Sequence, residues 1–162
     1  MCSKTSLFIL TITLLSACGQ KTPPVTATAT EKVDHYASGV VSRRTAMVGD
    51  KKEGKMSDYY NDGKLMAERW FKDDKQEGKT LIYYPSGKMK EVQYYVEGYR
   101  EGGDTVWYEN GQVQFTLGFK NNKKHGDLYK WSPEGQLIFN SRYENDSLVE
   151  VKGKLISAQE TK

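Results

Sequence analysis

Residues 78–101 read GKTLIYYPSGKMKEVQYYVEGYRE, and residues 102–125, which follow directly, read GGDTVWYENGQVQFTLGFKNNKKH. The two stretches align without a gap: each opens on glycine, carries two rings at its sixth and seventh positions and has another glycine at its tenth. A fixed period within about 20 to 50 residues is typical of arrays in which each unit packs against its neighbours. The chain is therefore predicted to be an internal repeat.

The same period of 24 residues extends to both sides of these stretches. One glycine column holds Gly54, Gly78, Gly102 and Gly126, and a second holds Gly39, Gly63, Gly87, Gly111 and Gly135. Four columns of rings or apolar side chains keep the same step: Tyr59, Tyr83, Trp107 and Trp131; Tyr60, Tyr84 and Tyr108; Leu65, Met89, Val113 and Leu137; and Phe71, Tyr95, Phe119 and Tyr143. Ser132 interrupts the second of these four columns.

Each unit is predicted to be a β-hairpin. The second glycine column follows the pattern Tyr-x-x-Gly, as in Tyr84-Pro85-Ser86-Gly87. A glycine that ends a three-residue loop supplies the left-handed backbone of a type I turn with a G1 bulge. The other end of each unit carries a pair of residues that suits a two-residue loop. These pairs are Asp73-Asp74, Glu97-Gly98, Asn121-Asn122 and Asn145-Asp146.

The chain is therefore expected to be an all-β protein, an extended antiparallel meander of about five hairpins in a single-layer twisted sheet. By alternation along a strand, every second residue from Leu65 to Phe71 should point to one face. The 11 tyrosines are expected to cover the sheet with their rings and to leave their hydroxyls in water. The degenerate unit at residues 36–47 and the segment 148–156 are the expected caps of the two sheet edges.

Composition divides the chain into four parts. Residues 1–17 have the layout of a secretory signal peptide, with one lysine, an apolar run and small residues before Cys18. Residues 18–31 are expected to form a lipidated cysteine and a flexible Thr/Pro/Ala tether. Residues 32–157 are expected to hold the repeats, and residues 158–162 a C-terminal tail.

The segment Leu15-Ser16-Ala17-Cys18 resembles a bacterial lipobox, whose cysteine receives a diacylglycerol group and becomes the mature N-terminus. Cys18 is then the expected lipid anchor, because two acyl chains suffice for stable attachment to a membrane. Two alternatives are an ordinary thiol beside a cleavage site and a transmembrane helix, which the short apolar run disfavours. A lipobox places the protein in a bacterial cell envelope, and Gly19 favours the outer membrane if the cell has two membranes.

The cysteine count and the charge exclude several functions. Cys2 would leave with the signal peptide, so the mature chain could form no disulfide and would have no free catalytic thiol. The formal charge of +3 is too small to steer the protein to nucleic acid, and export would separate it from that partner. We therefore expect contact with a membrane through the lipid and no nucleic-acid partner.

No pattern of catalytic residues is present. The chain has two histidines and lacks the zinc-binding H-E-x-x-H, paired C-x-x-C, the nucleophile elbow G-x-S-x-G and a phosphate-binding glycine loop. Pairs such as Asp73-Asp74 and Glu101 with Asp104 could serve as general acid and base or bind calcium, but they fall at or beside expected turns, where acids are common. We expect no enzyme activity, no metal, no cofactor and no small-molecule substrate.

The repeat units resemble the variant MORN repeats, in particular the bacterial set named YwqK-type antitoxins. The resemblance rests on YPSGKM at residues 84–89, YENGQV at 108–113 and FKNNKKHG at 119–126, and it covers about residues 32–149. Asp73-Asp74 and Asn121-Asn122 depart from the Asn-Gly that is usual in the second loop. The motifs are specific for the repeat class and not for one function. The resemblance implies hairpin repeats, and the name of the set implies an antitoxin.

Two functions are open. The first is a lipid-anchored, non-catalytic repeat protein that binds an unidentified protein partner through an aromatic face or its loops. We expect Trp70, Tyr94, Lys123 and His125 to contact that partner. The second is an antitoxin or immunity lipoprotein that meets an incoming toxin in the envelope, since a cytoplasmic antitoxin could not act there. The expected structural residues of the repeat are Gly63, Gly87, Gly111, Gly135, Tyr60, Tyr84 and Tyr108.

Overall fold

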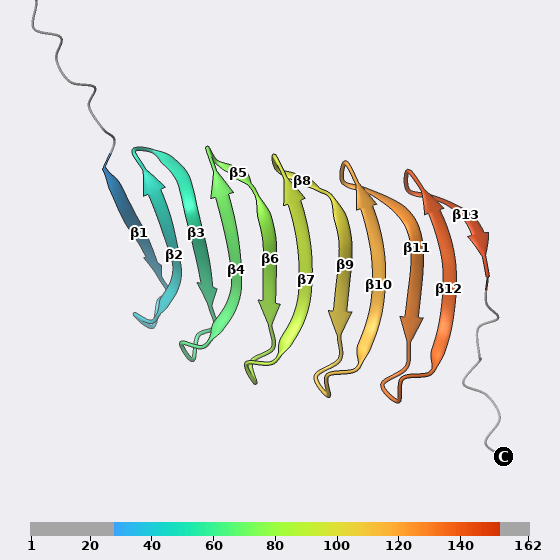
Figure 1. Cartoon of the computed structure of the whole chain (residues 1–162). Coiled ribbons are helices and arrows are strands. Elements are labelled where there is room, and N and C mark those ends of the chain that lie inside the picture. The colour runs from blue at the N-terminus through green and yellow to red at the C-terminus, as the bar shows by residue number, and fades with distance from the viewer. Residues whose placement is uncertain (1–27, 153–162) are drawn as a thin grey trace, which may run out of the picture.

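The computed structural model describes residues 28–152, which form one open antiparallel β-sheet of 13 strands (Figure 1). The strands are β1 (Ala29–His35), β2 (Val41–Val48), β3 (Lys51–Tyr59), β4 (Leu65–Lys72), β5 (Lys75–Gln76), β6 (Gly78–Tyr83), β7 (Met89–Val96), β8 (Tyr99–Arg100), β9 (Gly102–Trp107), β10 (Val113–Lys120), β11 (Lys123–Trp131), β12 (Leu137–Glu144) and β13 (Ser147–Val151). They follow the order β1-β2-β3-β4-β6-β7-β9-β10-β11-β12-β13, with β5 beside β4 and β8 beside β7. Residues 28–152 contain no helix. The expected all-β meander in a single sheet is confirmed.

The loops at the lower edge of the sheet in Figure 1 have the predicted turn. The N–H of Gly87 donates to the carbonyl of Tyr84, and the N–H of Tyr84 donates to the carbonyl of Lys88, both at 2.8 Å. Gly87 has φ 83°, in the left-handed region that strains any side chain. The equivalent glycines Gly39, Gly63, Gly111 and Gly135 have φ between 82° and 92°. The type I turn with a G1 bulge is therefore confirmed along the array.

The loops at the upper edge are two-residue turns, also as predicted. Both residues of each pair have positive φ, which is the backbone of a type I′ turn. Backbone hydrogen bonds also join each loop to the previous unit. For example, the N–H of Asn122 donates to the carbonyl of Arg100 at 3.0 Å, and the N–H of Asp146 donates to the carbonyl of Lys124 at 3.0 Å. The upper edge is thus held together by contacts between successive repeats.

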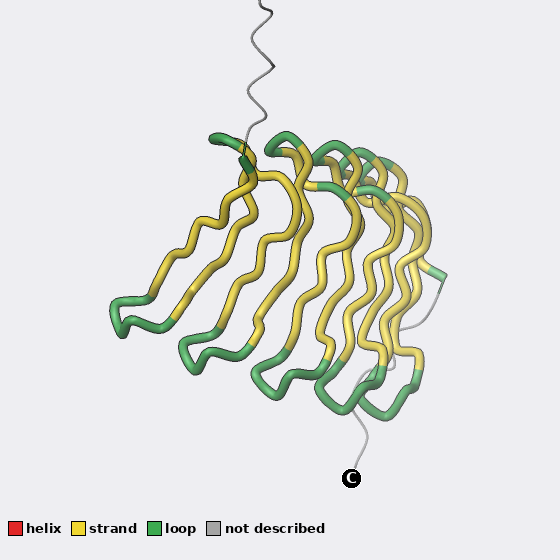
Figure 2. The backbone as a smooth tube through the Cα atoms, turned by 60° about the vertical axis from the view of Figure 1, so that its left-hand side comes forward, coloured by secondary structure: helices red, strands yellow, loops and turns green. Residues whose placement is uncertain are grey.

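The first glycine column marks a bulge in each unit. Gly54, Gly78, Gly102 and Gly126 have φ between 77° and 100°. Glu77, just before Gly78, donates its N–H to the carbonyl of Trp70 at 2.8 Å and separates β5 from β6. A bulge bends its strand and increases the local twist. The strands are accordingly curved along their length (Figure 2).

The two faces of the sheet differ in burial. The face that we call the core face carries Asp58, Ala67, Thr80, Asp104 and Leu117, each at most 6% exposed. Strand pairing and alternation place these residues on one side. In a sheet one layer thick, such burial requires the sheet to curl around the side chains, so the core face is concave. We call the opposite face the outer face.

In the column that begins at Tyr36, four tyrosine hydroxyls do not point into water, contrary to the sequence-based expectation. The hydroxyls of Tyr36, Tyr60, Tyr84 and Tyr108 donate to the carbonyls of Tyr59, Tyr83, Trp107 and Trp131 at 2.5, 2.7, 2.6 and 2.9 Å, respectively. Each acceptor lies 23 residues further along the chain, in the next unit. Burial raises the pKa of Tyr84. The column therefore joins successive repeats by hydrogen bonds as well as by ring packing.

The expectation that Leu65 and Ala67 point to the same face of the sheet is also wrong. Leu65 pairs with Tyr59 and Ala67 with Asp58, so a bulge adds one residue to β4 between these two pairs. Because the consecutive residues Asp58 and Tyr59 point to opposite faces, their partners do so too. The same shift recurs in the following units. It puts the column Leu65, Met89, Val113 and Leu137 on the outer face.

Ion pairs replace apolar packing over part of the core face. Only Met56, Ala67, Val106 and Leu117 are buried apolar residues within the described part of the chain. Asp58, 2% exposed, accepts a hydrogen bond of 2.5 Å from Nε of Arg43 and another from Arg69. A buried carboxylate is tolerated only when it is paired and hydrogen-bonded. Asp58 meets this condition through two guanidinium groups.

Asp104 forms a second buried acidic centre. Its carboxylate is hydrogen-bonded to Arg100, whose guanidinium carbon lies 3.9 Å from the centre of the Phe119 ring. Arg100 also pairs with Glu91 at 3.5 Å. Burial raises the pKa of Asp104 to about 6, against the opposing effect of Arg100. Oδ1 of Asp104 and Nε of Arg100 are buried and have no hydrogen-bond partner among the described residues.

The sheet ends in two open edges. β1 begins at Ala29, three residues before the expected start of the repeats at residue 32, and β13 ends at Val151. The predicted signal peptide, Cys18, most of the tether and the C-terminal tail lie outside the described residues. Within residues 28–152, no helix has the length and apolar character needed to cross a membrane.

Candidate binding face

Three rows of side chains cross the outer face at right angles to the strands. The Trp70 row holds Lys55, Trp70, Lys79, Tyr94, Gly103, Gly118, Asp127 and Arg142. The Thr105 row holds Ser57, Glu68, Leu81, Val92, Thr105, Thr116, Tyr129 and Asn140. The Trp107 row holds Tyr59, Leu65, Tyr83, Met89, Trp107, Val113, Trp131 and Leu137. Strand pairing and alternation put all three rows on one face.

Trp70 and Tyr94, two of the predicted contact residues, lie in the same row. Trp70 is half-buried, whereas Tyr94 is 40% exposed. The ammonium of Lys79, which stands between them, lies 5.8 Å from the centre of the Tyr94 ring. A cation over a ring face is attracted to it. Lys55, on the other side of Trp70, pairs with Glu68 at 2.9 Å. The row thus alternates cations and rings over four strands.

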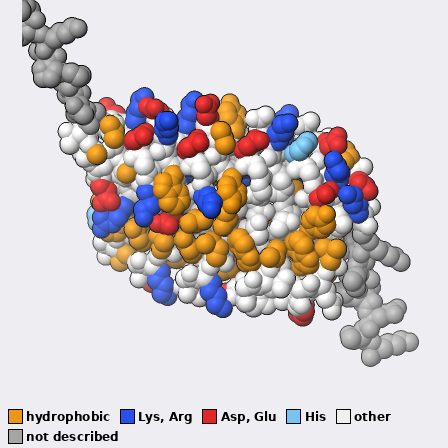
Figure 3. All heavy atoms as spheres, in the orientation of Figure 1, with side chains coloured by type: hydrophobic (Ala, Val, Ile, Leu, Met, Phe, Trp, Pro, Cys, Tyr) orange, Lys and Arg blue, Asp and Glu red, His pale blue; other side chains and the backbone are white. Residues whose placement is uncertain are grey.

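The Trp107 row is the apolar part of the outer face. Rings from the first strand of each hairpin alternate with aliphatic side chains from the second strand. At its far end the Tyr129 ring stacks on Trp131, with 5.8 Å between the ring centres. Leu137 is 45% exposed. Figure 3 shows hydrophobic side chains gathered in a band that runs across the strands below a rim of charged side chains.

An open hollow of about 370 Å³ lies beside this row. Its lining comprises Met89 and Trp107 from the row and Lys88, Asn110 and Gly111 from the lower loops. The wall of the hollow is mostly apolar. It could receive a single side chain of a partner, with Lys88 and Asn110 at its rim.

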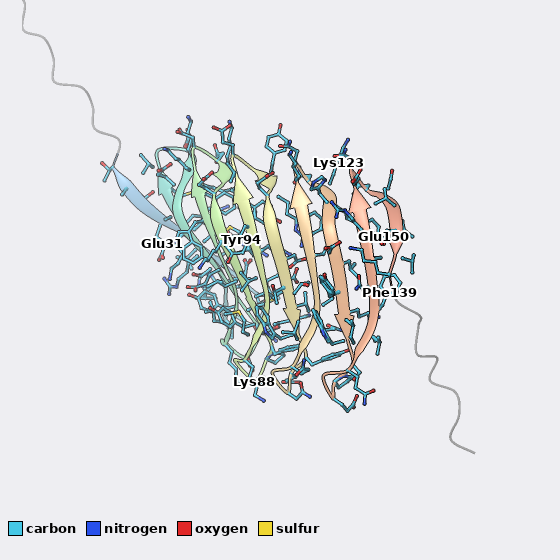
Figure 4. The ribbon with its side chains drawn as sticks, turned by 45° about the vertical axis from the view of Figure 1, so that its right-hand side comes forward. Glu31, Lys88, Tyr94, Lys123, Phe139 and Glu150 are labelled. Carbon is cyan, nitrogen blue, oxygen red and sulfur yellow. The ribbon has the colours of Figure 1, made fainter. Side chains whose placement is uncertain are left out.

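The structure does not bring Lys123 and His125 next to Trp70 and Tyr94. Both are exposed on β11, which β9 and β10 separate from the Tyr94 strand β7. Lys123 lies at the upper edge of the sheet, while Tyr94 lies within its body (Figure 4). The carbonyl oxygen of His125 occupies the space that a Cβ at Gly118 would take. Of the four predicted contact residues, only Trp70 and Tyr94 form one patch.

The column of Glu53, Glu77, Glu101 and His125 has a structural role that the sequence left unexplained. The first three carboxylates accept hydrogen bonds of 2.8 Å from the N–H groups of Asp73, Glu97 and Asn121, respectively. Each carboxylate therefore fixes the upper loop of the unit that follows it in the chain. His125 stands where a fourth carboxylate would be, so the last unit lacks this acid.

The acidic residues considered for catalysis or calcium binding form ion pairs or hydrogen bonds within the sheet and its loops. Asp73 pairs with Lys51 at 2.8 Å, Glu101 binds a loop N–H, and Asp104 is buried against Arg100. Within residues 28–152, no group of three or more His, Cys, Asp or Glu side chains is placed to hold a metal ion.

Sequence reasoning missed the two cations and the two glycines of the Trp70 row. Lys55 and Lys79 stand in one column, whose third member is Gly103, while Trp70 and Tyr94 stand in another, whose third member is Gly118. The sequence contains one signal of this row: in the third unit, glycine replaces the lysine of the first column and the aromatic residue of the second. This signal could be interpreted only after strand pairing had placed both columns in one row.

The family model of the MORN repeat variant matches residues 52–73, 76–97 and 105–121. The first two segments coincide with the hairpins β3–β4 and β6–β7, and the third covers part of β9 with β10. The chain therefore contains variant MORN repeats in its central units, as the resemblance predicted. Among curated proteins, none matches the chain.

Proposed function

We propose that this MORN-repeat chain is a non-catalytic protein-binding module, anchored by a lipid on Cys18 in a bacterial cell envelope. Its partner surface would be the outer face, centred on Tyr94. The envelope location is supported by the lipobox-like segment before Cys18 and by the tether that follows it.

The single observation that carries the binding role is the exposure of an aromatic and apolar surface on one side of the sheet. On this outer face Tyr94 is 40% exposed and Leu137 is 45% exposed. The core face, where such apolar side chains would be buried, was the alternative place for them. Soluble monomeric proteins rarely expose large apolar patches, and the patches that they do expose often mark interaction sites. Tyrosine and tryptophan are also the residues that most often dominate the energy of protein interfaces.

The experiment compares proteins captured by the tagged full chain from solubilised native membranes. Tyr94→Ala and Trp70→Ala should each reduce capture of the partner by roughly 30-fold, because a central ring contributes about 2 kcal/mol or more. Tyr99→Ala is the matched control, since Tyr99 is 54% exposed but lies in the two-residue strand β8 at the upper loops. Equal capture by all three variants would remove the outer face from the proposal.

An immunity lipoprotein is the second candidate, favoured by the lipobox together with the resemblance to antitoxin-type repeats. Its partner would be a toxin that arrives from outside. The two candidates differ in what is captured: a resident envelope protein supports the first, and a toxin encoded beside this chain supports the second. In both, the chain acts by binding and not by catalysis.

A further inference from the structure

The two open edges of the sheet differ in their chemistry. At the N-terminal edge, β1 carries Glu31, Lys32 and Asp34 among its seven residues. Glu31 pairs with Arg44 at 2.7 Å, and Lys32 pairs with Asp34 at 3.5 Å. Charged side chains along an edge strand discourage a further strand from pairing with it. The N-terminal edge is therefore protected.

The C-terminal edge lacks this protection. All five residues of β13 are exposed, and three of them are large and apolar. Leu148, Val149 and Val151 are 52%, 51% and 56% exposed, respectively. The acid of this strand, Glu150, pairs with Lys152 at 3.5 Å. Figure 4 shows Glu31 and Glu150 toward opposite ends of the sheet, so the apolar edge is the one far from β1.

The backbone of β13 presents hydrogen-bonding groups on the side away from β12. Among the described residues, β13 pairs only with β12. The N–H of Lys152 donates to the carbonyl of Asn140 at 2.9 Å, so Lys152 bonds toward β12. Because alternate residues of an antiparallel strand bond to a given neighbour, the N–H and C=O of Val151 point away from β12. Such a row of groups is a template for another extended backbone.

We propose that β13 is a second binding surface, at which an extended segment of a partner protein adds one strand to the sheet. Backbone hydrogen bonds hold the segment, and the side chains on one of its faces are apolar. Val151 pairs with Ser141 and lies on the core face, so the apolar side chains of the added strand cover it there. The inference goes beyond the outer-face site, because four strands of the main path separate β13 from the Tyr94 strand β7.

The short length of β13 favours a peptide segment over a second copy of the chain. Five residues span about 17 Å in a sheet, so pairing two copies of β13 would bury on the order of 400 Å² from each. Specific dimers bury about 600 Å² or more from each partner. An extended segment needs less area, because main-chain hydrogen bonds and alternate side chains hold it, as in other cases of strand addition.

A synthetic peptide tests strand addition. The probe alternates valine and lysine over about eight residues, has blocked ends and carries a fluorophore, and its binding to the full chain is followed by fluorescence anisotropy. A second peptide has the same side chains but a methyl group on each valine nitrogen. The residues that bond to Val151 share its face, so this peptide loses the donors of the valine face. We expect saturable binding of the first peptide and about tenfold weaker binding of the second. Equal binding of both, or no saturable binding of the first, would overturn the proposal.

Val151→Lys tests the position of the added strand, because a lysine protects an edge. Leu137→Lys is the matched control: it adds the same charge, and Leu137 is 45% exposed on β12. The dissociation constant of the valine and lysine peptide should rise about tenfold for Val151→Lys and stay unchanged for Leu137→Lys. Thermal melting verifies that both variants fold. An equal change in the two variants would refute binding at β13.

Other occupants of the edge give different results. If the peptide binds only after residues 153–162 are removed, the chain's own C-terminal segment covers β13. If sedimentation shows a dimer that Val151→Lys dissociates, a second copy covers it. Either result would overturn the partner strand. Tyr94→Ala should leave peptide binding unchanged. Failure of peptide binding while capture still depends on Tyr94 removes the edge inference and leaves the proposed function standing.

Discussion

The hydroxyl of Tyr84 donates a hydrogen bond of 2.6 Å to the carbonyl oxygen of Trp107, which lies 23 residues further along the chain and one repeat away. The contact is part-buried, and the rings of both residues belong to columns that recur every 24 residues. A tyrosine at this position therefore joins two units whose backbones are also paired through β7 and β9. The repeats depend on each other through such contacts.

Tyr84→Phe should consequently destabilise the fold, although it keeps the ring. The carbonyl of Trp107 would lose its donor, which costs about 1 to 3 kcal/mol where water cannot replace it. Tyr94→Phe is the control, because no hydrogen bond of the Tyr94 hydroxyl is formed within the described residues and its ring is exposed. Chemical denaturation measures both. Equal stability of the two variants would show that the hydroxyl of Tyr84 is hydrated.

Gly87→Val should lower the melting temperature through backbone strain. Gly87 has φ 83° and nothing lies within 4 Å of a Cβ built there, so strain and not a clash is the cause. Forcing a side chain into the left-handed region costs on the order of 1 to 2 kcal/mol. Gly103→Val is the matched control, since it has equal space and no positive φ. A similar loss in both variants would argue against the turn.

Gly118→Ala should destabilise the fold through a steric clash and not through backbone strain. The added Cβ would overlap the carbonyl oxygen of His125, so β10 and β11 would have to separate. Overpacking of this kind costs about 1 to 3 kcal/mol. Gly103→Ala, on the neighbouring strand of the same row, should be close to neutral. Thermal unfolding of the two alanine variants compares them, and the order Gly103 worse than Gly118 would contradict the close approach.

The repeat made the hairpins and their turns predictable, because residues such as Gly87 and the pair Asp73-Asp74 are types that tolerate the positive φ of these turns. It did not predict which residues share a face. One extra residue in β4 moves Leu65 to the outer face, and nothing in the local sequence marks such a bulge. The ion pairs of Asp58 were equally hidden, since Arg43 and Arg69 look like ordinary surface charges until the sheet curls over them.

The candidate site was predicted only in part. Trp70 and Tyr94 were identified from their aromatic character, and pairing put them into one row. Lys55 and Lys79 were missed because lysines look like ordinary surface charges until strand pairing sets them beside these rings.

Cys18→Ala should move the protein from the membrane fraction to the soluble fraction. The variant would lose the acyl chains that hold it to the membrane. Each buried methylene group of such a chain contributes about 0.8 kcal/mol to membrane binding. Fractionation of cells with antibody detection measures the change, and Cys2→Ala is the control, since Cys2 precedes the apolar run. A cleaved Cys18→Ala protein that stays in the membrane fraction would exclude the lipid anchor.

Asp104 should make the stability depend on pH in a direction opposite to that of most carboxylates. Burial raises its pKa in the folded chain to about 6, above the value of about 4 in the unfolded chain. The folded state therefore binds the proton more tightly. The stabilisation is fully present below about pH 4 and is lost as the pH rises through about 6.

Asp104→Asn removes this titration while keeping the shape of the side chain. The melting temperature of the variant relative to the wild type should therefore be more favourable at pH 7.5 than at pH 4.5. Asp62→Asn should show the opposite sign, because hydrogen bonds from Lys64 lower the pKa of Asp62, and its stabilisation is lost as the pH falls. Melting curves of the wild type and both variants at the two pH values give these differences. If Asp104→Asn loses more stability at pH 7.5 than at pH 4.5, attraction to Arg100 outweighs burial at this site, and the buried carboxylate is held in its charged form.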